Sequence, residues 1–192
     1  GWPIWPLIFA SVIALAIIIE RIWSLRENVI APNDLLSEVQ KMITKNGVRQ
    51  EALESLKNHS MLGEIFASAL NNYDSSSEII KEAIEETGRA VNHKLERYLS
   101  TLATIATVAP LLGFFGTIIG MVELFSSFTS GATDVAPFAK GISIALYNTA
   151  GGIAVAVPAM IAYRFFRSKI DNLIVEMEQQ AIKLVEIIQG KR

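Results

Sequence analysis

The sequence predicts an all-α integral membrane protein with three transmembrane helices, and three observations support this fold class. Of the 192 residues, 51% are hydrophobic and 19% are charged, which is more apolar than a soluble domain of this size. Three apolar segments, 2–19, 102–125 and 142–166, are long enough, at about 1.5 Å rise per residue, to cross a hydrocarbon core of about 30 Å. Apolar positions elsewhere recur at helical spacing. We expect two long helices that continue into a cytoplasmic helical collar.

The first transmembrane helix is expected over residues 1–24. Trp5 and Trp23 bracket its apolar stretch as interfacial anchors, and it lacks the basic start and the cleavage site of a secretory signal. Basic residues cluster after this span, before the second and after the third: Arg21, Arg26, Lys94, Arg97, Arg164, Arg167 and Lys169. Because cytoplasmic loops are rich in lysine and arginine, we expect a periplasmic N-terminus and a cytoplasmic C-terminus.

Residues 25–100 are expected to form a helical insertion in the cytoplasm. Asn33 suits the N-cap of a helix that Gly47 ends, and weaker helical patterns cover residues 51–57 and 61–73. From residue 77 onward, apolar positions recur at helical spacing without a break into the second span. We therefore expect one helix to continue from residue 77 to residue 125.

The second transmembrane helix, expected over residues 101–127, carries a row of small residues. Ala109, Gly113, Gly116 and Gly120 are three or four residues apart, so they share one side of the helix and let another helix approach closely. A short periplasmic loop is expected over residues 128–136, where glycine, aspartate and proline favour a break between helices.

The third transmembrane helix is expected over residues 137–166 and carries a second row of small residues. Gly141, Ala145 and Gly152 follow the same spacing. The two rows can pack against each other or against copies of the chain in a homo-oligomer, and both alternatives stay open here. Residues 167–192 repeat apolar positions at spacings of four and three, which predicts a cytoplasmic C-terminal helix that packs on other helices.

Three of the polar side chains inside the spans are candidates for lining a path through the membrane. Thr117, Asn148 and Thr149 can line a path for water or ions, because a polar group at this depth needs a partner. In the alternative reading, the hydroxyls bond back to the preceding helical turn and Asn148 joins two helices for packing alone. Glu123 and Lys140, near the outer span ends, are either ordinary interfacial charges or charges at the outer mouth of such a path.

The middle of each span carries no ionisable side chain. A proton relay needs a titratable group near the middle of the membrane, so a partner would have to supply that group. His59 and His93 are the only histidines and cysteine is absent, which argues against a metal site and against enzymatic chemistry by these groups. The sequence also contains neither a phosphate-binding loop nor a basic patch, so we expect no cofactor and no nucleic acid.

Two stretches resemble the MotA/TolQ/ExbB proton-channel family: APLLGFFGTIIGMVELF at residues 109–125 and AKGISIALYNTAGGIAVAVPAMIAYRFF at residues 139–166. The chain looks most like the ExbB branch, since MotA-type proteins have four spans. The resemblance places the family's pore threonines at Thr117 and Thr149. Some members carry a glutamate where this chain has Ile144, so a carboxylate ring at that position is not expected here.

The resemblance implies a complex in the bacterial inner membrane. A ring of five copies would enclose ExbD-like single-span subunits, whose aspartate carries protons, and proton flow would drive a TonB-like protein that energises outer-membrane uptake of iron–siderophore complexes. In this reading Thr117, Asn148 and Thr149 line the proton path, and the rows of small residues set subunit contacts. Two alternatives stay open: a TolQ-like subunit of the Tol-Pal envelope system, and a membrane scaffold that conducts no protons. Threonines facing a ring interior would favour the channel, and threonines buried against the same chain would favour the scaffold.

Overall fold

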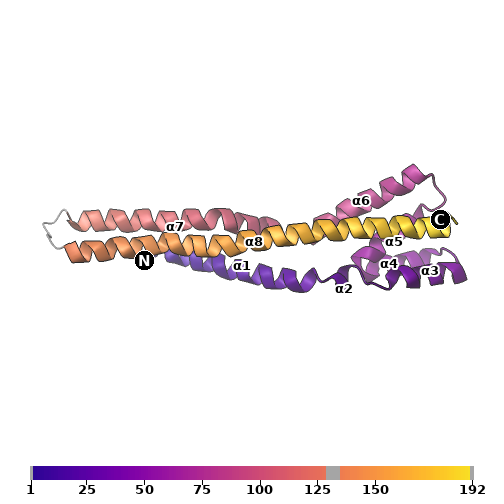
Figure 1. Ribbon diagram of the computed structural model, residues 1–192, viewed down its shortest axis with the longest axis horizontal. Coiled ribbons are helices and arrows are strands. Elements are labelled where there is room, and N and C mark those ends of the chain that lie inside the picture. The colour runs from indigo at the N-terminus through magenta and orange to yellow at the C-terminus, as the bar shows by residue number, and fades with distance from the viewer. Residues whose placement is uncertain (1, 129–134, 191–192) are drawn as a thin grey trace. The chain divides into compact units, whose positions relative to one another are not determined.

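The computed structural model describes residues 2–128 and 135–190, and every secondary-structure element over these residues is an α-helix (Figure 1). The all-α prediction is therefore confirmed. The helices are α1 (Ile4–Ser24), α2 (Glu27–Ile30), α3 (Leu35–Asn46), α4 (Gln50–His59), α5 (Met61–Asn71), α6 (Ser77–Leu95), α7 (Leu99–Phe128) and α8 (Val135–Ile188). The chain forms two compact units, Gly1–Glu20 with Tyr98–Phe165 (unit 1) and Arg21–Arg97 with Phe166–Arg192 (unit 2).

Three of the described helices are long and apolar enough to cross a membrane: α1, α7 and α8. In unit 1, α7 and the first part of α8 lie side by side (Figure 1). Leu7 of α1 packs with Ala109 of α7 and Ala156 of α8 in a small buried cluster. Large apolar side chains point outward from these helices, including Phe9, which is 68% exposed. A helix that is apolar on its outside suits lipid as its surroundings.

Unit 2 has a conventional buried core. Its most deeply buried large side chains are Leu25, which follows α1, and residues of α5, α6 and the last part of α8: Leu62, Ile65, Phe66, Leu70, Ile84, Phe166, Ile170, Met177 and Leu184. The predicted C-terminal apolar repeat thus supplies buried positions, as its spacing indicates. Helices α3, α4 and α5 correspond, in order, to the three helical patterns expected between residues 33 and 73.

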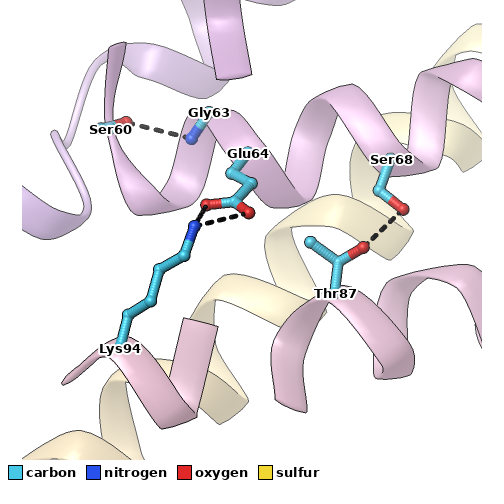
Figure 2. A network of polar contacts seen from close by, with 6 residues as sticks. All are labelled: Ser60, Gly63, Glu64, Ser68, Thr87 and Lys94. Atoms are coloured by element: carbon cyan, nitrogen blue, oxygen red, sulfur yellow. Dashed lines mark hydrogen bonds and ion pairs between the residues drawn. The ribbon is translucent and has the colours of Figure 1, made fainter. Parts of the chain in front are cut away.

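Polar contacts join α5 to α6 beside this core (Figure 2). The Thr87 hydroxyl donates to Ser68 Oγ at 2.7 Å, and Ser68 in turn donates to the carbonyl of Ala83 at 3.1 Å. Lys94 Nζ lies 3.0 Å from both carboxylate oxygens of Glu64. These contacts fix the register of the two helices.

The expectation of one helix from residue 77 to residue 125 is wrong. Helix α6 ends at Leu95 and α7 begins at Leu99, and Tyr98 between them has a φ of 70°. The buried Arg21 guanidinium donates from Nη1 to the Leu95 carbonyl at 2.9 Å, and Arg167 forms an ion pair with Glu96. Because the Arg21 side chain satisfies a carbonyl at the end of α6 and Arg167 holds Glu96, the helix ends without glycine or proline.

Smaller differences concern helix ends. Helix α3 has Asp34 as its N-cap in place of the expected Asn33, and its side chain makes no capping hydrogen bond. Gly47 ends α3 with a φ of 73°, as expected. Helix α8 is continuous from the third apolar segment into the C-terminal repeat. Most of the predicted loop at 128–136 falls on residues 129–134, which lie outside the described residues.

Candidate functional site

The two rows of small residues pack against each other within unit 1. A Cβ at Gly113 would lie 3.0 Å from the Cα of Gly152, and a Cβ at Gly152 would lie 2.6 Å from the carbonyl oxygen of Ala109. Both glycines are buried. Only residues without a side chain allow α7 and α8 to approach this closely. The closest contact between the two helices therefore depends on this glycine pair.

The contact continues along both helices. A Cβ at Gly116 would lie 3.0 Å from Asn148 Cβ, and one at Gly120 would lie 3.0 Å from Ala145 Cβ. Gly141 faces Leu124, whose Cδ1 would lie 2.6 Å from an added Cβ. Of the two partners that the sequence left open, the structure shows the other helix of the same chain. A role of these small residues in contacts between subunits stays a prediction, and Gly120 and Gly141 are partly exposed.

The structure brings Thr117 and Thr149 together. Their hydroxyls are hydrogen-bonded to each other, and Thr117 Oγ1 also lies 2.7 Å from the carbonyl oxygen of Ala145 and 3.2 Å from that of Gly113. If the single Thr117 proton goes to the nearer carbonyl, Thr149 donates to Thr117 and keeps its own lone pairs for another donor. Both threonines are half-buried, so each contacts its own chain and retains exposed surface.

A groove of about 280 Å³ lies next to this pair, between α7 and α8. Its lining residues are Pro3, Gly116, Ile119, Gly120, Glu123, Leu124, Ser127, Gly141, Ile144, Ala145 and Asn148. Asn148 therefore lies at one end of the groove, against Gly116, and Glu123 lies nearer the other. Lys140 is exposed and is not among the lining residues, so the structure does not bring the two predicted outer charges to one site.

The groove is the feature that the sequence reading missed. Gly116, Gly120, Glu123 and Ser127 are separated by four, three and four residues, which is the same helical spacing that identified the glycine row. This spacing is the signal that could have placed the Glu123 carboxylate on the face of α7 that meets α8, but it was not used for that residue. Chemically, the arrangement offers a carboxylate, an amide and two hydroxyls within apolar helices, which are groups that hold water and protons.

Comparison with known proteins agrees with the resemblance. A model of the MotA/TolQ/ExbB proton channel family matches residues 57–179. Over 168 residues the chain is 34% identical to the biopolymer transport protein ExbB-like 3 of Synechocystis, covering 85% of the chain and 79% of that protein. It is 24% identical over 192 residues to the biopolymer transport protein exbB1 of Vibrio cholerae, covering 93% and 80%. It is 32% identical over 162 residues to an ExbB homolog of Methanothermobacter thermautotrophicus, covering 83% and 57%.

The matched region contains the threonine pair, both rows of small residues and every lining residue of the groove except Pro3. With three helices that are long and apolar enough to span, the chain is a multi-pass membrane protein. The chain belongs to the MotA/TolQ/ExbB proton channel family, within which it is most like ExbB.

Proposed function

We propose that this chain is the channel and motor subunit of an ExbB–ExbD-type complex in the bacterial inner membrane. In this proposal, the proton motive force drives the complex, which energises TonB-dependent import across the outer membrane. The observation that carries the proposal is the hydrogen-bonded pair of Thr117 and Thr149 within two apolar helices. Hydroxyls at this depth interact with water or with a proton-carrying partner when the path is occupied.

The proposal requires a partner with a titratable group. Glu20 and Glu123 are the only acidic residues of α1 and α7, and both lie near helix ends, while α8 has no acidic residue before Asp171. An ExbD-like single-span protein would bring an aspartate to the threonines. Several copies of the chain, five in the proposed ring, would enclose such a helix, with the N-terminus in the periplasm and the C-terminus in the cytoplasm.

One observation favours the competing scaffold function. The Thr117 hydroxyl is engaged by Ala145 and Thr149 of its own chain, so its hydrogen bonds need no conducting path. The channel function requires that the free lone pairs of Thr149 accept a hydrogen bond from water or from another protein, whereas the scaffold function does not.

The testing experiment is a native mass measurement in mild detergent, followed by proton-flux measurements in liposomes. The chain is purified with and without the single-span protein encoded beside its gene. A ring that captures this protein, conducts protons and restores TonB-dependent uptake to an ExbB-deficient strain supports the proposal. A ring that instead restores only Tol-Pal function assigns the TolQ branch, and a complex with no flux assigns the scaffold.

A further inference from the structure

The groove between α7 and α8 is wide because several of its lining residues are glycines, which have no side chain to fill it. Gly116, Gly120 and Gly141 line it, and the remaining walls are formed largely by Ile119, Leu124 and Ile144. Its volume of about 280 Å³ far exceeds the roughly 10–15 Å³ that one water molecule needs. An apolar cavity of this size can stay dry, so its polar lining groups decide whether water enters.

Three polar side chains line this groove from the two helices. The Glu123 carboxylate and the Ser127 hydroxyl belong to α7, and the Asn148 amide belongs to α8. Asn148 is half-buried, and its side chain makes no hydrogen bond with any residue that the structure describes. An amide carries two donors and an acceptor, and leaving them unpaired within apolar helices is unfavourable. Water entering the groove would satisfy them.

The two ends of the groove are lined by different residues. Gly116 and Asn148 meet at one end, and they directly precede Thr117 and Thr149 in the sequence. Glu123 lies seven residues beyond Gly116 in α7, which is about 10 Å along the helix axis. It is close to Phe128, where α7 ends. The lining therefore runs from a carboxylate near the end of the helix to Gly116 and Asn148, the sequence neighbours of the hydrogen-bonded threonine pair.

We propose that this groove is a water-filled entry path for protons and that Glu123 is the group that loads it. The inference rests on the proposed function. A Glu123 carboxylate oxygen binds a proton from the water outside and releases it to a groove water, which passes one of its own protons to the next water. Glu123 is then a carboxylate again. The Asn148 amide carries no proton; it positions the waters at the inner end, beside Thr149.

The hydration of the groove is tested without measuring any proton flux. The chain contains no cysteine, so a single cysteine reports one position. Ile144 and Leu146 are two residues apart on α8 and are 53% and 55% exposed, but only Ile144 lines the groove. In membranes with the assembled complex, I144C should react with a charged thiol reagent at least about tenfold faster than L146C, because the reacting thiolate forms in water. Equal rates would overturn the hydrated groove.

The role of Glu123 is tested by proton flux through the complex in liposomes. E123Q removes the proton-binding carboxylate with almost no change in shape, whereas E123D retains it. We expect E123Q to lower the flux at least about tenfold and E123D to keep most of it, because only aspartate retains a carboxylate that can bind and release a proton. Glu51→Gln, on the exposed surface of α4 in unit 2, is the control for removing an acidic side chain and should keep the flux.

The outcomes separate the two proposals. Wild-type flux in a fully assembled E123Q complex overturns Glu123 as the loading group and leaves the channel function standing. A wild-type complex that conducts no protons overturns the channel function and the loading role together, while the cysteine comparison still decides whether the groove is wet.

Discussion

Gly113 and Gly152 lie against each other so closely that a methyl group on Gly113 would come within 3.0 Å of the Cα of Gly152. Two backbones approach this closely only when neither residue has a side chain at the contact. The threonine pair and the groove lie further along the same helix contact, so their geometry depends on this spacing. Substitutions at the glycine pair therefore test the framework of the site.

Replacement of Gly152 by alanine should destabilise unit 1 by about 1–3 kcal/mol, the usual cost of forcing an extra methyl group into a packed site. The new Cβ would lie 2.6 Å from the Ala109 carbonyl oxygen, so the backbone of α7 has to move. Thermal unfolding of the complex in detergent measures the change, and the yield of assembled oligomer should fall with it.

Gly151→Ala is the matched control on the same helix. Its Cβ would meet only Leu7 Cδ2, at 3.2 Å, and the flexible end of a leucine can shift. We expect a change within about 0.5 kcal/mol. Equal losses for the two variants would show that helix contact at Gly152 is not the cause.

Replacement of Thr87 by valine should weaken the contact between α5 and α6 by about 1 kcal/mol, the net value of one hydrogen bond. Valine keeps the shape of threonine but no longer donates to Ser68 Oγ, which is 2.7 Å away (Figure 2). Urea unfolding followed by circular dichroism measures the loss. Thr44→Val in α3 is the control, because the exposed Thr44 hydroxyl bonds only within its own helix, to the carbonyl of Gln40. A loss as large for Thr44→Val would contradict the assignment to the helix contact.

The sequence predicted features that depend on local spacing. Gly113 and Gly152 were identified as contact positions because helical periodicity needs only near neighbours. Helical periodicity did not decide which surface the two glycines meet. Packing on another helix of the same chain and packing on a second copy of the chain favour the same pattern. The spacing of Glu123 from Gly120 holds the same kind of information and was not used, while the groove itself depends on where α8 lies.

The break between α6 and α7 was not predictable from the same information. Apolar positions continue through residues 95–99, and no glycine or proline marks the end of a helix. The break is held by Arg21, which is 74 residues from Leu95 in the sequence, and by the ion pair of Arg167 with Glu96. Such long-range partners override local periodicity, and only the folded chain shows them.

Replacement of Arg21 by methionine should therefore destabilise unit 2 by about 1.5–3 kcal/mol, the range for a hydrogen bond to a charged group. Arg21 is 5% exposed and donates to the Leu95 carbonyl, so methionine keeps the packing of the stem and leaves that carbonyl without this donor. We expect faster proteolysis between residues 95 and 99 and a lower urea midpoint.

Arg26→Met is the control for the loss of a positive charge beside the first span. Arg26 is exposed and bonds to the nearby Trp23 carbonyl at 2.9 Å, so it should change stability little. Both variants remove one basic residue near the C-terminal end of α1, so they should change the membrane orientation of the chain to the same extent. Similar proteolysis of both variants would point to orientation as the cause and contradict the role of Arg21 at the end of α6.

Replacement of Thr149 by valine should reduce proton flux while the complex still assembles. Valine preserves the shape of threonine, and the Thr117 hydroxyl retains its contacts with the carbonyls of Ala145 and Gly113, so the helix pair keeps most of its hydrogen bonds. The path loses the lone pairs that Thr149 presents outward. If this raises the barrier by about 1.4 kcal/mol, close to one hydrogen bond, the flux falls about tenfold. Flux into liposomes measures the change, native mass confirms assembly, and Thr149→Ser should restore conduction because it returns the hydroxyl. Undiminished flux in an assembled Thr149→Val complex would remove Thr149 from the path and favour a purely structural role for its bond to Thr117.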